Sequence, residues 1–289
     1  MKFTIFNYSS PAFLQPIYFK AECDKLKSCE MILLNSSNNV YHVYDTVKPD
    51  YSIINIGMNL DLFRHYNDNS ETKISHILNL DYLNDNSISD VQEMLKQDTL
   101  LNCVLLFSGN RKHKNVKFGL PYVYVPNSAD VNIPKSKTFF DIDMGIVINS
   151  DKDKKEYQNT YHFITIGNEQ VHADINVNNI SAARIFCNYK TIIFRNMNVD
   201  IVPETFFNAI YFGNMVYFDN DNEADSKQLT EVIQRIFDTD ASFNFKDQQH
   251  YDVTAIRDKI FHKHSSKNRF KTLLSQLKNT HNIITEMGE

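Results

Sequence analysis

Short runs of β-branched and aromatic residues recur along the chain and alternate with longer polar stretches that suit helices. Strands that are buried on both faces of a parallel sheet have this composition, because helices cover the sheet on each side. The pattern therefore predicts an α/β fold with mainly parallel sheets. The expected strands are residues 3–7, 31–34, 51–56, 73–78, 103–107, 122–125, 143–148, 162–166, 191–194 and 215–218.

The strand pattern pauses after Pro126 and restarts at Asp143. A chain of 289 residues is long enough for two domains of ordinary size. We therefore expect a first domain over residues 1–137 and a second over 138–265, with a C-terminal helix, 266–289, that returns to the first domain. The other expected helices are residues 16–26, 89–96, 180–186, 203–212, 226–237 and 253–261.

The composition, 42% hydrophobic and 22% charged, allows a sizeable core. A formal net charge of −5 argues against nonspecific coating of nucleic acid, so a polyanion would have to be met by a local basic patch. The four cysteines lack C-x-x-C spacing, which argues against a zinc site or a disulfide framework and favours a reducing, cytoplasmic location. No run approaches the ~18 apolar residues of a membrane span, so we expect no membrane partner.

The segment 198–218 reads as a loop, a helix that Pro203 opens, a stop at Gly213 and a buried strand. Such a helix points its N-terminus into a cleft, where backbone N–H groups and the helix dipole suit a diphosphate. The segment resembles the donor-binding segment of GT-B glycosyltransferases, in which a helix with the pattern F-E-x-x-A-x-G precedes an apolar strand. Phe207, Gly213 and residues 215–218 match that pattern in register.

Further segments extend the resemblance. Residues 143–150 resemble the strand and turn that open the second GT-B domain, and residues 164–167 and 179–186 resemble the next strand and helix. Residues 73–83 resemble a strand of the phage DNA glycosyltransferases that modify hydroxymethylcytosine, the β-glucosyl type and its arabinosyl relatives, which ends in a catalytic aspartate. The resemblance is fuller in the second half of the chain than in the first.

The resemblance to this family of bacteriophage enzymes implies a GT-B fold, with two Rossmann-like domains that face each other across a cleft. It implies a nucleoside diphosphate sugar, UDP-linked, as the donor and duplex DNA as the acceptor, and we expect a monomer. The expected reaction transfers the sugar to the hydroxymethyl group of a modified pyrimidine. A GT-B enzyme that acts on a cell-surface glycan or a protein, and a noncatalytic GT-B-like binding module, are the alternatives.

The resemblance implies that Asp81, at the end of its strand, takes the proton from the attacking hydroxyl. A loop or helix-capping aspartate is the structural alternative, because polar residues collect where strands end. Asp45, Asp50 and Asp61 are less favoured candidates for the same role.

On the donor helix the family carries an Arg and a Glu where this chain has Thr205 and Asn208. Asn208 can hydrogen-bond a hydroxyl, and Glu204 lies one helical turn away on the same face. We therefore expect Glu204, Thr205 and Asn208 to face the nucleotide, with Gly167 also beside the donor. The missing cation is expected from Arg195, Lys152 or Lys154, with Arg184, Lys155 and Lys190 as alternatives.

Acceptor residues are expected in two places. Tyr8, Ser9 and Ser10 follow the first strand at the carboxyl end of the sheet, where α/β proteins build their sites, although a serine pair before a proline is also an ordinary turn. The basic runs 111–117 and 257–271 suit phosphates, although a charge run is as often a solvated surface. The expected phosphate contacts are Lys112, Lys114, Lys263 and Lys267.

Overall fold

The structure is a computed structural model, and its described helices and strands form two compact units. The described residues of unit 1 fall within 1–126 and 267–287, and those of unit 2 within 127–266. The domain boundaries expected from the sequence are after residues 137 and 265. The described residues are 1–6, 15–34, 46–55, 75–81, 85–96, 103–129, 131, 142–148, 150–157, 164–167, 173–176, 186–247 and 250–287.

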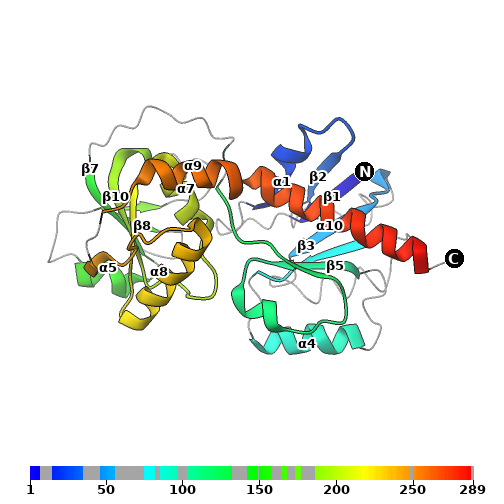
Figure 1. The fold of residues 1–289 in the computed structure, drawn as a ribbon, viewed down its shortest axis with the longest axis horizontal. Coiled ribbons are helices and arrows are strands. Elements are labelled where there is room, and N and C mark those ends of the chain that lie inside the picture. The colour runs from blue at the N-terminus through cyan, green and yellow to red at the C-terminus, as the bar shows by residue number, and fades with distance from the viewer. Residues whose placement is uncertain are drawn as a thin grey trace. The chain divides into compact units, whose positions relative to one another are not determined.

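Unit 1 is built on a parallel sheet with the strand order β2-β1-β3-β4-β5-β6 (Figure 1). The strands are β1 (Lys2–Phe6), β2 (Glu30–Leu34), β3 (Tyr51–Asn55), β4 (Ser75–Asn79), β5 (Cys103–Ser108) and β6 (Tyr122–Tyr124). The helices are α1 (Gln15–Cys23), α4 (Asp85–Lys96), the 3-10 helix η2 (Arg111–Asn115) and α10 (Ser266–Met287). All strands run the same way, so their carboxyl ends meet at one edge of the sheet.

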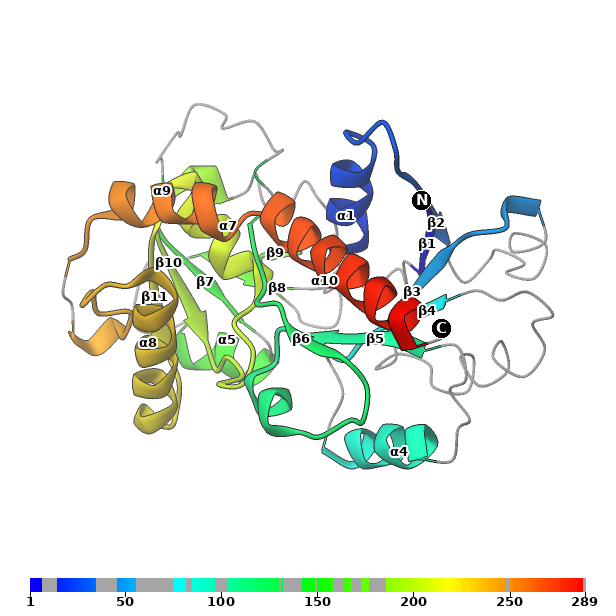
Figure 2. The ribbon, with the colours of Figure 1, turned by 45° about the vertical axis from the view of Figure 1, so that its right-hand side comes forward.

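Apolar side chains are buried on both faces of this sheet. Leu78 of β4 belongs to the same buried cluster as Val91 of α4, and the next-door residue Ile77 belongs to the cluster that contains Phe270 of α10. Successive strand residues point to opposite faces, which explains the unbroken apolar run. The ring of Phe270 lies 5.4 Å from that of Phe19, centroid to centroid. The last helix of the chain is therefore part of the core of unit 1 (Figure 2).

Unit 2 is built on a second parallel sheet, with the order β11-β10-β7-β8-β9. The strands are β7 (Ile142–Val147), β8 (Ile164–Gly167), β9 (Ile175–Asn176), β10 (Tyr189–Arg195) and β11 (Met215–Asp219). The helices are α5 (Asp151–Tyr157), η3 (Phe186–Asn188), α7 (Glu204–Phe212), α8 (Glu223–Phe237), η4 (Phe245–Asp247) and α9 (Val253–Lys263). The order changes direction between β7 and β10, and ligands of doubly wound sheets bind at the carboxyl ends beside such a point.

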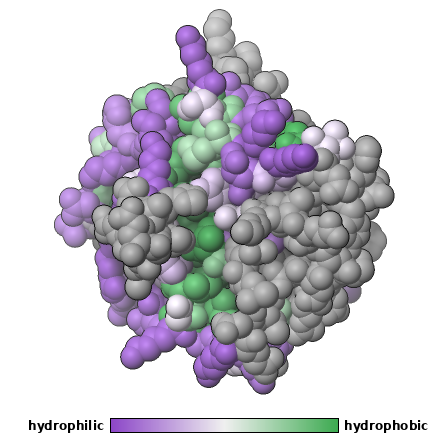
Figure 3. Space-filling model, turned by 90° about the vertical axis from the view of Figure 1, so that its right-hand side faces the viewer, coloured by the Kyte–Doolittle hydropathy of each residue, from purple (hydrophilic) through white to green (hydrophobic). Residues whose placement is uncertain are grey.

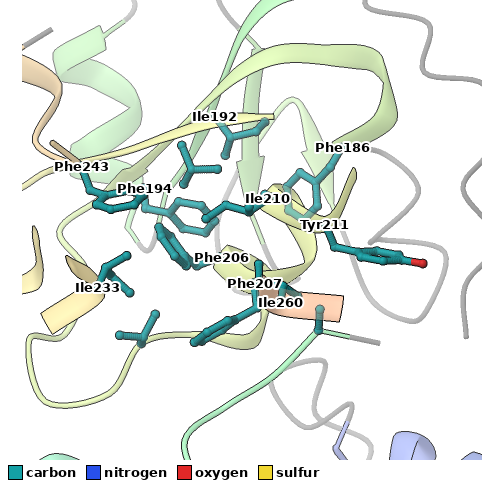
Figure 4. Close-up of a cluster of buried hydrophobic side chains, with 14 of the residues drawn as sticks. Phe186, Ile192, Phe194, Phe206, Phe207, Ile210, Tyr211, Ile233, Phe243 and Ile260 are labelled. Atoms are coloured by element: carbon teal, nitrogen blue, oxygen red, sulfur yellow. The ribbon is translucent and has the colours of Figure 1, made fainter. Parts of the chain in front are cut away.

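Helix α7 is buried along almost its whole length in an aromatic cluster (Figure 4). Phe206 stacks on Phe218 of β11 with centroids 5.0 Å apart, while the hydroxyl of Tyr211 points away from the cluster and donates to the backbone of Val131. Gly213 ends the helix at φ 96°, a left-handed conformation that suits glycine, and donates its N–H to the carbonyl of Ile210. This packing fixes the direction of α7 relative to its sheet.

The expected α/β class with parallel sheets is confirmed, and a few local elements differ from those expected. Residues 151–157 form helix α5 and residues 175–176 form the two-residue strand β9, and neither element is among those expected from the sequence. Helix α5 begins where the Ser150 hydroxyl donates to the Asp153 carboxylate at 2.8 Å. The expected helix over 180–186 lies outside the described residues except for Phe186, which opens η3.

Few large apolar side chains are exposed in the described part of the chain: Met1, Leu26 and Phe261. On the face drawn in Figure 3, hydrophilic side chains border a narrower strip of apolar ones. Among the described helices, none combines the length with the apolar composition that crossing a membrane requires.

Candidate functional site

The N-cap residue of α7 supplies no side-chain hydrogen bond to the first turn of the helix. Its N-cap residue is Pro203, which has the extended conformation φ −68°, ψ 151° and contributes no side-chain hydrogen bond. The neighbouring helices differ, because Asn222 caps α8 through the N–H of Ala224 and Asp252 caps α9. Since α7 follows β10 directly, its N-terminus lies at the carboxyl edge of the unit 2 sheet. A ligand anion is an acceptor that suits such an N-terminus.

Three residues of α7 were expected to contact a nucleotide. Glu204 opens the helix and is 8% exposed, Thr205 is half-buried, and Asn208, one turn after Glu204, is only 1% exposed. Thr205 therefore presents the most side-chain surface of the three. The expected contacts of all three with a donor stay predictions.

Arg195 ends β10 beside this helix, and three aspartates surround its buried guanidinium. Nη2 pairs with Asp221, Nη1 donates to the backbone carbonyl of Asp219 at 3.2 Å, and Nε lies 3.7 Å from Oδ1 of Asp153. Asn196 extends the network, because its amide donates to Asp153 at 2.6 Å and its carbonyl accepts the N–H of Asp221 at 2.9 Å. The positive charge of Arg195 is thus already balanced within the protein.

The two lysines expected near the donor also have aspartate partners. Nζ of Lys152 lies 3.5 Å from Asp221, and Nζ of Lys154 lies 3.0 Å from Asp174. Burial pushes the pKa of Asp221 upward, but the charges of Arg195 and Lys152 outweigh it and lower that pKa below its ordinary value. Gly167 stands at the carboxyl end of β8. Within the described residues, no cluster of three or more His, Cys, Asp or Glu side chains is arranged to hold a metal ion.

Asp81, the expected proton acceptor, follows β4 at the carboxyl edge of the unit 1 sheet. Its Oδ1 accepts the backbone N–H of Gly109, and its Oδ2 accepts Nη2 of Arg269 at 3.1 Å. Both side chains of this ion pair are 2% exposed. The carboxylate therefore joins the end of β4, the turn after β5 and the first turn of α10. Its expected role as a base stays a prediction.

The other candidate bases are placed differently. Asp50 accepts the N–H of Lys2 at 2.8 Å, which puts it at the amino edge of the sheet, away from the carboxyl ends. Asp45 and Asp61 lie outside the described residues, as do the expected acceptor residues Tyr8, Ser9 and Ser10.

The turn after β5 carries η2, and buried polar groups hold it. The Ser108 hydroxyl accepts the N–H of Asn110 at 2.9 Å and lies 2.9 Å from Nδ1 of the buried His113. Asn110 in turn caps η2 by accepting the N–H of Lys112 at 3.0 Å. The side chain of Lys114 extends over the ring of Tyr124, with Nζ 3.7 Å from the ring centroid.

The four lysines expected to meet phosphates are exposed, and they divide between the units. Lys112 and Lys114 lie on η2 and Lys267 lies in the first turn of α10, all in unit 1, whereas Lys263 ends α9 in unit 2. Sequence reasoning did not anticipate Arg269 as the partner of Asp81, although one signal was present. Arg269 stands next to Phe270 and one turn before Leu273, on the apolar stripe of α10, where a charge needs a buried partner.

Comparison with known proteins finds relatives by structure alone. No protein-family model matches the chain, and no curated protein matches its sequence. An alpha-glucosyltransferase in complex with UDP has a TM-score of 0.61 at 10% identity, over 96% of this chain and 100% of that one.

Two further solved structures are similar across nearly the whole chain. An alpha-glucosyltransferase in complex with UDP-glucose and DNA containing an abasic site has a TM-score of 0.59 at 12% identity, over 95% of this chain and 98% of that one. The spinosyn forosaminyltransferase SpnP has a TM-score of 0.52 at 9% identity, over 96% of this chain and 99% of that one. Identities this low concern the fold alone, and the chain has the GT-B fold of these glycosyltransferases.

Proposed function

We propose that the protein is a glycosyltransferase that moves a sugar from a UDP-linked donor to the hydroxymethyl group of a modified pyrimidine in duplex DNA. The observation that carries this proposal is the N-terminus of α7, whose N-cap residue Pro203 makes no side-chain hydrogen bond and which lies at the carboxyl edge of a Rossmann-like sheet. In the GT-B fold this edge belongs to the sugar-nucleotide domain, and two similar structures contain UDP or UDP-glucose.

The donor is proposed to place its diphosphate against the first turn of α7. The backbone N–H groups there donate to the phosphate oxygens, and the helix dipole favours their negative charge. As the sugar leaves, the same groups stabilise the charge that develops on the departing UDP. Glu204 and Thr205 belong to this first turn, so we assign them to the nucleotide.

The reaction is a displacement at the anomeric carbon of the sugar. A bond forms between that carbon and the acceptor oxygen, the bond from the carbon to the diphosphate oxygen breaks with its electron pair, and the hydroxyl proton passes to a base. We keep Asp81 as the proposed base. Its carboxylate accepts two hydrogen bonds, one on each oxygen, and each oxygen keeps a further lone pair that can take the proton. A pyrimidine in a duplex has to leave the base stack to reach such a site.

The DNA acceptor has weaker support than the donor. One structurally similar glucosyltransferase is in complex with DNA, and exposed lysines lie on η2 and in the first turn of α10 in unit 1. The protein carries a formal net charge of −5, so it can attract a DNA phosphate backbone only where positive side chains gather locally.

A noncatalytic GT-B-like binding module is the second candidate. The observation in its favour is that Arg195, Lys152 and Lys154 each have an aspartate partner, which leaves fewer positive charges for a diphosphate.

Release of UDP from UDP-glucose separates the two candidates. We expect release in the presence of duplex DNA that contains hydroxymethylcytosine, and little release with plain DNA or with a free oligosaccharide. Binding of UDP-glucose, seen as a thermal shift, without any release would favour the binding module. Release with the oligosaccharide alone would move the acceptor from DNA to a glycan.

The Asp81→Asn variant tests the base. It preserves the shape of the side chain and an oxygen for the N–H of Gly109 but removes the proton acceptor. It also removes the charge that pairs with Arg269, so the protection of the β4 and β5 amides is measured alongside. We expect UDP release to be abolished while UDP and DNA still bind. Full activity in this variant would assign the proton to another group.

A further inference from the structure

Tyr124 ends β6, one of the two edge strands of the unit 1 sheet, in a cluster of charged side chains. Nζ of Lys114 lies 3.7 Å from the centroid of its ring. Burial raises the pKa of the Tyr124 hydroxyl, the nearby charges of Arg111 and Arg269 pull that pKa down, and the Asp81 carboxylate raises it. Three positive side chains and one negative side chain therefore surround this tyrosine.

The negative side chain of this cluster, Asp81, already has hydrogen-bond partners. Asp81 uses one oxygen for Gly109 and the other for Arg269, and the Asp81–Arg269 pair is buried. Arg111 and Lys114 therefore remain as positive charges that Asp81 does not pair with in the described structure. Excess positive charge beside a partly exposed aromatic ring favours an anionic ligand.

Arg111 has a second unusual feature. Its side chain is half-buried, yet Nη1 is shielded from solvent and has no hydrogen-bond partner among the described residues. Shielded N–H groups are usually hydrogen-bonded in folded proteins, so the Arg111 guanidinium has donor capacity to offer an acceptor. A guanidinium donates two parallel hydrogen bonds to a phosphate group, and a tyrosine hydroxyl also donates to phosphate oxygens in protein–DNA complexes.

The backbone around Arg111 is held in place before any ligand arrives. Asp81 fixes the N–H of Gly109, Asn110 caps η2, and the buried His113 is anchored on the Ser108 hydroxyl. A positive side chain on such a fixed turn loses little freedom when it binds.

We propose that Arg111 and Lys114, with the hydroxyl of Tyr124, bind a phosphodiester group of the DNA acceptor. This inference rests on the proposed function, and it adds Arg111 and Tyr124 to the lysines that the sequence suggested. A contact of this kind positions the duplex and reads no base, so it acts equally on plain and hydroxymethylated DNA.

The test is the salt dependence of DNA binding, measured by fluorescence anisotropy of a labelled duplex with the full chain. Each neutralised phosphate contributes about 0.9 to the slope of log affinity against log salt. We expect Arg111→Met to reduce the slope by about that amount on both plain and hydroxymethylated duplexes. Arg111→Lys, which keeps the charge, should retain most of the slope, and Tyr124→Phe should weaken binding with the slope unchanged.

Lys96→Met is the matched control, because Lys96 is an exposed cation that ends α4, outside both basic runs, with no contact to Tyr124 among the described interactions. We expect its slope to equal that of the unmodified protein. Equal slopes for Arg111→Met and the unmodified protein would overturn the inference. A loss of UDP affinity in Arg111→Met would also overturn it, because the phosphate would then belong to the donor.

Failure of the proposed function has a different signature. An unmodified protein that binds DNA but neither binds UDP-glucose nor releases UDP would refute the glycosyltransferase. The slope difference between Arg111→Met and Lys96→Met would still measure the phosphate site in that case.

Discussion

Among the described residues at the carboxyl edge of the unit 1 sheet, the Asp81 carboxylate pairs with Arg269, and the charge of Arg111 acts on the nearby Tyr124. The carboxyl edge of the unit 2 sheet holds one buried guanidinium, Arg195, among three aspartates. Positive charge is thus in excess at the first edge and neutralised at the second. The difference suggests that unit 1 meets phosphate with side chains, whereas unit 2 meets it with the backbone of α7.

The two arginines also differ in the exposure of the carboxylates that they contact. Arg269 contacts Asp81 in an ion pair in which both side chains are buried. Arg195 has a half-exposed partner in Asp221 and a buried one in Asp153. Removal of Arg269 therefore leaves the buried Asp81 carboxylate with the N–H of Gly109. Removal of Arg195 instead leaves Asp153 with donors from Ser150 and Asn196.

The largest expected effect comes from Arg269→Met. This variant leaves the Asp81 carboxylate buried without its charge partner, which costs about 3–5 kcal/mol in stability. Hydrogen exchange of the β4 and β5 amides reports the loss in unit 1 without assuming that the whole chain unfolds at once. The control, Lys271→Met, changes an exposed cation of the same helix and should alter the exchange free energy by less than about 0.5 kcal/mol.

The double variant Asp81→Asn with Arg269→Met sharpens this prediction. It removes both charges together, so protection should return most of the way towards that of the unmodified protein. A small loss in Arg269→Met, below about 1 kcal/mol, would mean that the pair is weaker than its burial indicates.

A smaller effect is expected from removing one backbone donor at the first turn of α7. Proline is tolerated at the first helical position, and Pro203 before it is already extended, so Glu204→Pro should keep the helix. Glu204→Ala loses the same carboxylate but keeps the N–H. We expect UDP to bind the proline variant about tenfold more weakly than the alanine variant in calorimetry, the scale of one hydrogen bond to a charged group.

Equal UDP affinities in these two variants would contradict the contrast between the units, because the backbone N–H of residue 204 would then contribute nothing to UDP binding. A large loss of UDP affinity in both variants would instead indicate that the Glu204 carboxylate contacts UDP.

The smallest effect is expected from Lys152→Met. The Lys152 side chain is 79% exposed and lies 3.5 Å from Asp221, and ion pairs of this kind contribute ~0–1 kcal/mol. UDP affinity should therefore stay within about threefold of that of the unmodified protein. A larger loss in calorimetry would return Lys152 to the role that the sequence suggested, as a phosphate-binding cation.

Much of the fold could be predicted from the sequence, because parallel strands buried on both faces leave unbroken apolar runs such as residues 103–107 and 191–194. The pattern misses elements with little apolar content. Helix α5 has the sequence DKDKKEY, and its described hydrogen bonds at Ser150, Asp153 and Asn196 depend on side chains rather than on an apolar stripe. The strand β9 has two residues, too few for a periodic signal.

The candidate site was less predictable, because its contacts join residues that are distant in sequence. Asp81 and Arg269 are separated by 188 positions, and the sequence around either residue does not indicate that the other is its partner. Arg195 and Asp219 are opposite each other in the register of β10 and β11, so polar residues at the ends of adjacent strands were the available signal. Sequence reasoning counted Arg195 as a cation for the donor and did not count the aspartates around it.

The mass of DNA after incubation with the protein tests the central claim most directly. Duplexes that contain either hydroxymethylcytosine or plain cytosine are incubated with UDP-glucose and the full chain, and each strand is then weighed by mass spectrometry. We predict a gain of one hexose for each accessible hydroxymethyl group and no gain on plain DNA, which offers no nucleophilic hydroxyl near the anomeric carbon. An unchanged hydroxymethylated strand, under conditions in which UDP-glucose binds and UDP is released, would contradict the DNA acceptor.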